Sequence, residues 1–137
     1  AYSCTECGRC TSECPANITG KKLSPRKIMM DTRDRLEKVS KNISINKGKF
    51  IDDGDRLLDN YISKEELWAC TSCNACVEAC PINIDPLSII MDMRQYLIME
   101  ESSAHPDLNN MMNNIENNGA PWPYNQLDRE LWAQETQ

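Results

Sequence analysis

The sequence predicts an all-α protein made of two similar halves, each a cysteine loop followed by one helix. Three observations lead to this fold class. Two blocks of four cysteines lie 66 residues apart with the same spacing, and a helix start with a leading proline follows each block. The 55 residues between Cys14 and Cys70 carry helix caps rather than the alternating pattern of strands. The length of 137 residues fits one domain of this kind.

The cysteine blocks carry the chemistry. Both read C-x2-C-x2-C-x3-C-P, the pattern by which ferredoxin-type proteins hold [4Fe–4S] clusters. Three closely spaced thiolates surround one cluster, and the fourth, held out of helical geometry by the proline after it, ligates the other cluster. We therefore expect one cluster on Cys4, Cys7, Cys10 and Cys80, and a second on Cys70, Cys73, Cys76 and Cys14.

Two other uses of the thiols stay open at this point. A structural zinc site normally takes four ligands from two separated C-x2-C pairs, so three cysteines within seven residues, twice over, form a redundant set for zinc. Disulfides belong to oxidising compartments and allow 105 pairings of eight cysteines. The repeated spacing favours the clusters over both.

The similarity between the halves extends beyond the cysteines. Fifteen residues from Cys4 and from Cys70 agree at eight positions, and after five extra residues in the first half a further six of thirteen agree. Ser24 and Asp85 are N-cap residues, each followed by a proline at the first helical position. The apolar stripes expected to face the core are Ile28, Met29, Thr32, Leu36 and Val39, and then Ile89, Ile90, Met93, Tyr96, Leu97 and Ile98.

Other elements follow from local signals. A capping box at Ser63–Glu66 predicts a helix that runs into the second cysteine block. Residues 41–62 are polar and predict a loop with a short helix at 57–61. In the tail, a stripe of Leu108, Met111, Met112 and Ile115 predicts a helix ending near Gly119, followed by an extended linker and a last helical stretch at 126–134.

Composition and charge exclude several classes of function. The net charge is −6 and the pI is about 4.8, which disfavours nucleic-acid binding. The mean hydropathy is −0.59 and no apolar run approaches the roughly 18 residues of a membrane helix, so no direct membrane insertion is expected. No nucleophile–base pair, phosphate loop or dinucleotide fingerprint is present, and His105 is expected at the surface.

The charge is distributed unevenly along the chain. Residues 1–69 carry a net charge of +2, and residues 70–137 carry −8. A hypothetical docking site for an acidic redox partner is the basic strip formed by Lys21, Lys22, Arg26 and Lys27.

Over residues 1–100 the chain resembles the α-helical ferredoxin domain of succinate dehydrogenase and fumarate reductase iron–sulfur subunits. The segment Leu67-Trp68-Ala69-Cys70-Thr71-Ser72-Cys73 is similar to the small iron–sulfur subunit of heterodisulfide reductase and to the front module of related Fe–S oxidoreductases. Because both cysteine blocks are complete, the resemblance implies two [4Fe–4S] clusters. Many family members continue into a catalytic part with Cys-Cys-Gly motifs, which this sequence lacks.

These features together predict an electron-transfer module that relays electrons between a redox donor and the catalytic part of an oxidoreductase. We expect a dicluster domain at 1–102, and at 103–137 a helical arm or linker toward a further catalytic domain. The expected partner is a redox subunit or domain: a Cys-Cys-Gly catalytic domain, a flavoprotein, or a membrane quinone or haem subunit. Catalysis by this chain alone is not expected, and the expected location is cytoplasmic, with membrane association through a partner. A non-redox scaffold braced by clusters or zinc is the alternative.

Overall fold

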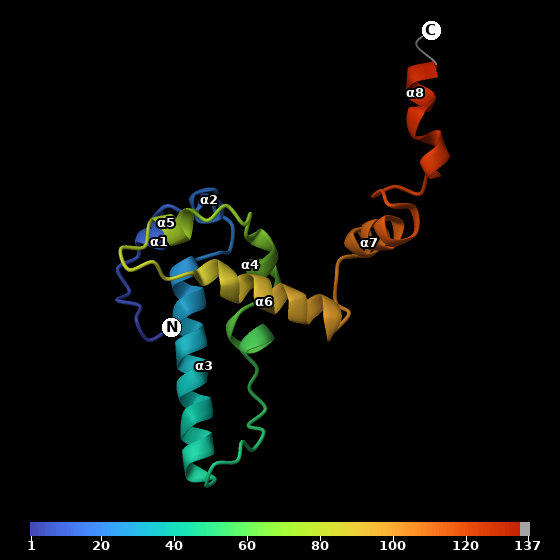
Figure 1. Cartoon of the computed structure of the whole chain (residues 1–137). Helices are drawn as coiled ribbons and strands as arrows, with labels where there is room; N and C mark the ends of the chain where they lie inside the picture. Colours follow the sequence, from blue (N-terminus) through green and yellow to red (C-terminus); the bar gives the residue numbers. More distant parts are fainter. Residues whose placement is uncertain (135–137) are drawn as a thin grey trace. The chain divides into compact units, whose positions relative to one another are not determined.

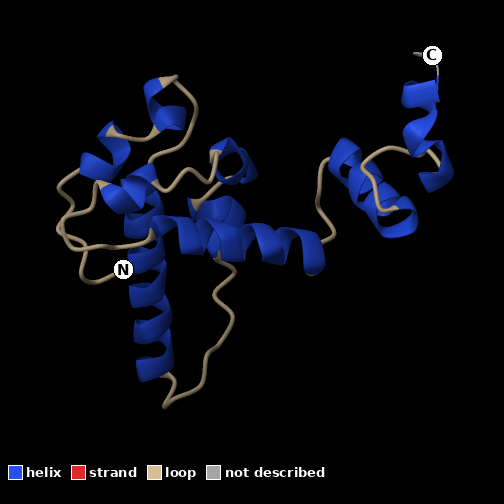
Figure 2. Cartoon of the chain, turned by 45° about the horizontal axis from the view of Figure 1, so that its top comes forward, coloured by secondary structure: helices blue, strands red, loops and turns tan. Residues whose placement is uncertain are grey.

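The computed structural model describes residues 1–134, which are drawn as helix and loop without a β-strand (Figures 1 and 2). The all-α prediction is confirmed. The helices are α1 (Arg9–Ser12), α2 (Pro15–Ile18), α3 (Pro25–Ile45), α4 (Lys64–Ala69), α5 (Ala75–Glu78), α6 (Pro86–Met99), α7 (Pro106–Asn118) and α8 (Leu131–Gln134), with a 3₁₀ turn at Gln126–Glu130 before α8.

The chain forms two compact units, the first at Ala1–Tyr96 and the second beginning at Leu97. The first unit contains both cysteine blocks. The domain boundary at residue 102 stays a prediction. No helix within residues 1–134 is both long enough and apolar enough to cross a membrane.

The predicted helix starts are confirmed. Pro25 and Pro86 are the first residues of α3 and α6, where the missing N–H costs nothing. The Ser24 hydroxyl accepts a hydrogen bond from the Lys27 N–H at 3.3 Å, and Asp85 Oδ1 accepts one from the Ser88 N–H at 3.0 Å. These caps satisfy N–H groups that the helices cannot pair internally.

The buried apolar residues of the first unit come from several short elements. They are Ala16, Leu23, Ile28, Met29, Leu58, Ile62, Leu67 and Ile90. The predicted stripe of α3 is correct near its start but wrong at Leu36, which is 46% exposed. Arg35 is buried there instead, because its guanidinium pairs with Asp53.

The connection between α3 and α4 also differs from the prediction. Helix α3 continues to Ile45, so the loop begins later than residue 41. Residues Leu57–Tyr61 form a turn rather than a regular short helix, since Leu58 is extended and Asp59 has a φ of 73°. The turn directs Leu58 into the core and lies against α3.

In the second unit, α7 ends where the sequence predicts. Gly119 follows Asn118 with a φ of 66°, the left-handed conformation that terminates helices most cheaply in glycine. His105 is exposed, as expected. Its Nδ1 accepts a hydrogen bond from the Asp107 N–H at 3.4 Å, so it also caps the start of α7. The stripe of α7 is less buried than predicted, since Met112 is 36% and Ile115 48% exposed.

Short helices bring the two cysteine blocks together. Figures 1 and 2 show α1, α2 and α5 gathered at the end where α3 and α6 begin. Helix α1 contacts α5 directly, although the two are separated by more than 60 residues of sequence. The packing of these two short helices therefore places both cysteine loops at the same end of the first unit.

Candidate metal centre

The two cysteine loops share one backbone conformation. Glu6 and Ser72 have φ values of 59° and 56°, and Gly8 and Asn74 have values of 83° and 63°. In each loop these left-handed residues flank the second cysteine, Cys7 or Cys73. Alternating right- and left-handed backbone forms concave nests of N–H groups, which bind anions and are common at iron–sulfur sites.

The helices after the loops repeat the same offset. Helix α1 begins two residues after Cys7 and α5 begins two residues after Cys73. The halves then diverge. Cys14 is extended, with a φ of −77° and a ψ of 116°, and α2 begins at the next residue. The residue after Cys80 begins no helix, and Asn83 has a φ of 53°. As expected, the proline after Cys14 holds this cysteine out of helical geometry.

A first cavity opens between the cysteine blocks. Cys4, Cys7 and Cys10 of the first block line it together with Cys80 of the second. Cys76 also contributes to its wall, and most other lining groups are apolar, including Met29 and Ile82. The structure therefore brings Cys80 to the three closely spaced cysteines of the other block.

A second cavity lies beside the cysteines of the second block. Cys70, Cys73 and Cys76 of the second block line it together with Cys14 of the first, and Leu23, Leu87 and Ile90 complete the apolar wall. Cys14 and Cys76 are buried, whereas Cys7 and Cys73 are exposed.

The donor set of the two cavities fits iron–sulfur clusters. All eight cysteines are free thiols, with five lining the first cavity and four the second, because Cys76 borders both. Within residues 1–134 no group of three His, Cys, Asp or Glu side chains is placed to hold a single metal ion.

Burial changes the acidity of these thiols. It raises the pKa of Cys76 to about 11 and raises that of Cys10 as well. The exposed Cys73 has a lowered pKa because the Ala75 N–H and the Thr71 hydroxyl hydrogen-bond to its sulfur. Cys76 and Cys10 are therefore protonated at neutral pH until metal binds, and metal binding releases their protons.

Backbone N–H groups also contact the candidate ligands. The Ile84 N–H donates to Cys80 Sγ at 3.3 Å, and the Ser72 N–H donates to Cys70 Sγ at 3.4 Å. Hydrogen bonds to cluster sulfurs are one of the ways in which a protein adjusts a reduction potential.

Two arginines brace the loops, and sequence reasoning missed their role. Arg33 on α3 bonds Glu6 at 2.7 Å, and Arg94 on α6 donates to the carbonyl oxygens of Leu67 and Cys70, both at 2.6 Å. The two arginines occupy equivalent positions in the repeat. Their identity in both halves was a signal that could have revealed this role.

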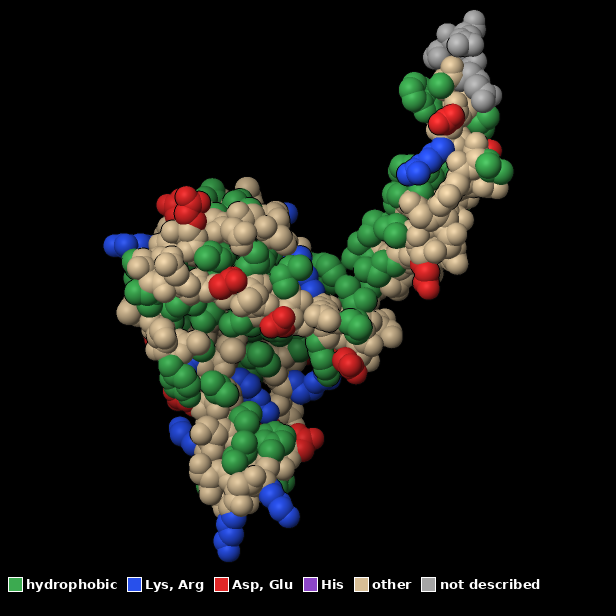
Figure 3. All heavy atoms as spheres, viewed as in Figure 1, with side chains coloured by type: hydrophobic (Ala, Val, Ile, Leu, Met, Phe, Trp, Pro, Cys, Tyr) green, Lys and Arg blue, Asp and Glu red, His purple; other side chains and the backbone are tan. Residues whose placement is uncertain are grey.

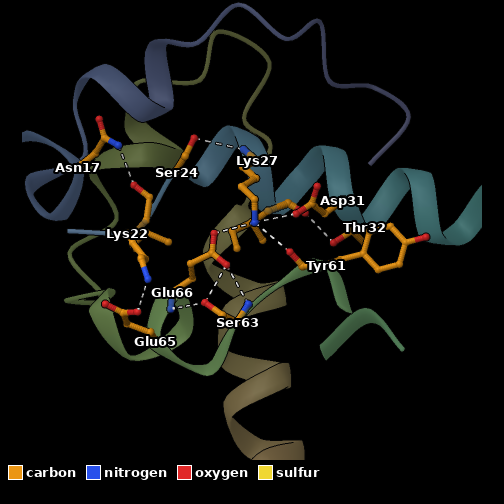
Figure 4. Close-up of polar contacts among 12 residues, drawn as sticks. Asn17, Lys22, Ser24, Lys27, Asp31, Thr32, Tyr61, Ser63, Glu65 and Glu66 are labelled. Carbon is orange, nitrogen blue, oxygen red and sulfur yellow. Dashed lines mark hydrogen bonds and ion pairs between the residues drawn. The ribbon is translucent and has the colours of Figure 1, made fainter. Parts of the chain in front are cut away.

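Lys27 belongs to a polar network that joins α3 to α4 (Figure 4). Its ammonium donates to the Tyr61 carbonyl oxygen at 2.9 Å and pairs with Glu66 at 2.7 Å and with Asp31 at 3.1 Å. Burial opposes the ionisation of Glu66, but hydrogen bonds from Lys27 and Ser63 outweigh it, so the pKa of Glu66 lies below its usual value.

This network bears on the hypothesis of a basic docking strip, which stays a prediction. Lys27 is used inside the network, and Lys22 pairs with Glu65 at 2.9 Å. Two of the four predicted docking cations are therefore engaged within the chain. On the face drawn in Figure 3, basic side chains instead project at the far end of α3 and from the loop after it.

Comparisons with known proteins agree with this site. A family model described as a 4Fe-4S dicluster domain matches residues 3–84. The probable iron–sulfur-binding oxidoreductase FadF of Bacillus subtilis is 33% identical over 98% of this chain and 23% of its own length. The EtfAB:quinone oxidoreductase of Syntrophomonas wolfei is 28% identical over 97% of this chain and 21% of its own length.

A third relative is one of the subunits of the ferredoxin/F420H2-dependent CoB–CoM heterodisulfide reductase of Methanosarcina acetivorans. It is 31% identical over 72% of this chain and 47% of its own length. The chain spans about a fifth of the length of the two oxidoreductases and just under half of this reductase polypeptide. No solved structure matched the chain.

The family model covers more than half of the chain and includes all eight cysteines. The resemblance to heterodisulfide reductase subunits and related oxidoreductases is confirmed by the relatives. The chain belongs to the 4Fe-4S dicluster domain family.

Proposed function

We propose that this chain is an electron-transfer module that holds two [4Fe–4S] clusters and relays electrons to the catalytic part of an oxidoreductase. The first cluster is ligated by Cys4, Cys7, Cys10 and Cys80, and the second by Cys70, Cys73, Cys76 and Cys14. The bound clusters supply one-electron redox chemistry, and the protein holds them in place and excludes water from their apolar sides.

One observation carries this proposal: each cavity brings three cysteines of one block together with the fourth cysteine of the other, and Cys76 also borders the first cavity. The reciprocal composition matches the ligand exchange that the C-x2-C-x2-C-x3-C-P pattern produces in two-cluster ferredoxins. Cys76 lies in the wall of both cavities, so the two clusters are held close enough for electron exchange.

The partner is a redox protein or domain. The relatives are named as oxidoreductases or as part of a reductase. By analogy, the module passes electrons between a donor and a catalytic site carried by another domain or polypeptide, and any membrane association is made through that partner. Exposed Cys7 and Cys73 give each cluster one edge near the surface, where a partner can approach.

Four serine variants test the ligand assignment. Cys14→Ser and Cys70→Ser should both perturb the second cluster, and Cys80→Ser and Cys4→Ser the first. We therefore expect the first two variants to lose one EPR signal of the reduced protein and the other two to lose the second signal. If Cys14→Ser instead lost the signal that Cys4→Ser loses, the crossed assignment would be wrong.

The wild-type protein tests the function itself. Anaerobically prepared protein should contain eight iron and eight sulfide per chain if both cysteine sets are filled. Its visible absorbance should bleach on reduction and return on oxidation. A colourless protein loaded with zinc, with no redox response, would favour the alternative of a non-redox scaffold.

A further inference from the structure

The two halves differ in the charge that faces their equivalent arginines. In the first half, Arg33 Nη2 donates to Glu6 Oε1 at 2.7 Å, and Asp34 lies 3.8 Å from Arg33 Nε. In the second half the position equivalent to Glu6 is Ser72, whose hydroxyl lies 3.5 Å from Arg94 Nη1. The charge of Arg33 is therefore neutralised, and that of Arg94 faces a hydroxyl.

The other contacts of Arg94 are also with neutral groups. Within residues 1–134 its guanidinium donates to the carbonyl oxygens of Leu67 and Cys70 and stacks 5.0 Å from the centre of the Trp68 ring. These bonds fix the guanidinium beside the Cys70 loop without cancelling its charge. Arg94 is therefore a fixed positive charge one hydrogen bond away from the backbone of a candidate ligand.

The carboxylate of Glu6 and the guanidinium of Arg94 each lie next to a cavity. Glu6 lines the first cavity, and Cys70, bonded through its carbonyl to Arg94, lines the second. Arg26 also lines the first cavity, but it is exposed, so water and salt screen its charge. The wall of the first cavity thus contains a carboxylate. Beside the second cavity lies an arginine that, among the described residues, faces the Ser72 hydroxyl and no carboxylate.

A nearby fixed charge changes the reduction potential of a cluster. Reduction adds one electron to the cluster, so a neighbouring positive charge stabilises the reduced state and a neighbouring carboxylate destabilises it. The difference between Glu6 and Ser72 therefore lowers the potential at the first site relative to the second.

We propose that Glu6 and Ser72 are the residues that set the two cluster potentials apart, biasing electrons toward the cluster of the Cys70 loop. This inference rests on the proposed function, since it concerns the same two clusters. The two residues act through Arg33 and Arg94, so they tune the clusters without ligating them.

The residues at positions 6 and 72 can be exchanged to test the proposal. Glu6 and Ser72 have nearly the same backbone conformation, so each substitution introduces a residue that the equivalent position already accommodates. In Ser72→Glu the new carboxylate pairs with Arg94, and in Glu6→Ser the carboxylate partner of Arg33 is removed.

Redox titration of the holoprotein, followed by EPR, measures the result. Ser72→Glu should shift one of the two one-electron steps to a more negative potential, and Glu6→Ser should shift the other step to a more positive potential. The difference between the two potentials should become smaller in both single variants. In the double variant the two decreases should add.

Two controls alter the net charge by the same amounts at positions that line neither cavity. Ser40→Glu on α3 and Asp52→Ser in the loop after α3 change exposed positions and should leave both steps in place. Iron and sulfide content equal to wild type shows that each variant has assembled its clusters. Arg94→Lys, which keeps the charge but not the guanidinium fork, should shift the potential less than Arg94→Gln.

The inference is overturned if both exchange variants shift the same step, or if neither shifts a step while the clusters are fully loaded. A wild-type protein without iron and sulfide would instead contradict the proposed function, so the two failures are distinguishable.

Discussion

At the scale of single residues, the Arg35–Asp53 pair shows how a charge can be buried in so small a protein. The guanidinium donates to both carboxylate oxygens of Asp53, at 2.6 and 2.8 Å. Such bidentate pairs combine charge with fixed geometry. The hydrogen bonds from Arg35 lower the pKa of Asp53 to about 2, so the pair persists through mild acid and holds the loop after α3 against that helix.

This pair leads to a prediction about pH. The stabilisation from Asp53 is complete above its unfolded pKa of about 4 and is lost as the pH falls through about 2. Asp53→Asn should therefore make the loop at residues 46–56 more sensitive to proteolysis at pH 7, while the wild-type loop stays equally protected at pH 5. Asp52→Asn is the control, because its side chain accepts a hydrogen bond only from the nearby Gly54 N–H. Loss of wild-type protection between pH 7 and pH 5 would contradict the prediction.

The same pair limits what can be predicted from the sequence at this scale. A helical stripe assigns the core position to Leu36, because periodicity counts apolar residues and ignores charge pairing. Arg35 is buried because Asp53, 18 residues away, satisfies it. By contrast, the cysteines were predictable as a candidate site, since their spacing is a local property of the chain.

At the scale of elements, helix α4 connects the core to the second cysteine block. The Ser63 hydroxyl accepts a hydrogen bond from the Glu66 N–H at 3.3 Å, and Glu66 Oε2 accepts one from the Ser63 N–H at 2.8 Å. This predicted capping box is confirmed. Leu67 within α4 is fully buried, and the helix ends at Ala69, immediately before Cys70. The position of Cys70 therefore depends on a helix of six residues.

Removing the cap should loosen this ligand. Ser63→Ala should destabilise α4 by about 0.5–2 kcal/mol, which corresponds to roughly 2- to 30-fold faster hydrogen exchange of its amides. We also expect iron to leave the second cluster faster when a chelator is added. Ser40→Ala, at an exposed position on α3, is the control and should behave like wild type. Unchanged exchange in α4 would show that packing of Leu67 alone fixes the helix.

The end of α3 shows why element boundaries were harder to predict than element starts. The Asn42 side chain pairs with the backbone of Ile51, donating to its carbonyl at 2.8 Å and accepting from its N–H at 3.0 Å. This contact with the returning loop supports the last turns of α3, whereas polar composition alone predicts a loop from residue 41. The helix starts are marked by capping residues within four positions of the first turn. The end of α3 depends on Ile51, which is nine residues beyond Asn42.

At the scale of the whole molecule, the eight cysteines line two cavities of the first unit. Metal sites of this kind are rarely formed before the metal binds, so the free energy of metal binding contributes to folding. Folding of the first unit is therefore expected to depend on filling them with clusters.

Removing iron and sulfide tests this dependence. The stripped protein, kept reduced so that no disulfides form, should lose its near-UV circular dichroism and part of its helical signal, because tertiary packing is lost with the clusters. Protein treated with reductant alone is the control. A metal-free protein with an intact near-UV spectrum would show that the helices pack without the clusters.

The reciprocal lining of the cavities has a consequence for the origin of the repeat. One half alone supplies three cysteines to its own cavity and offers its fourth to a neighbour. A single half is therefore complete only beside a second copy, arranged with twofold symmetry so that each copy completes the other. In this chain the two copies are joined by a covalent connector, which leaves each free to diverge, as Glu6 and Ser72 have done. On the proposed function the two sites are unequal, and unequal sites would give electron transfer between them a preferred direction.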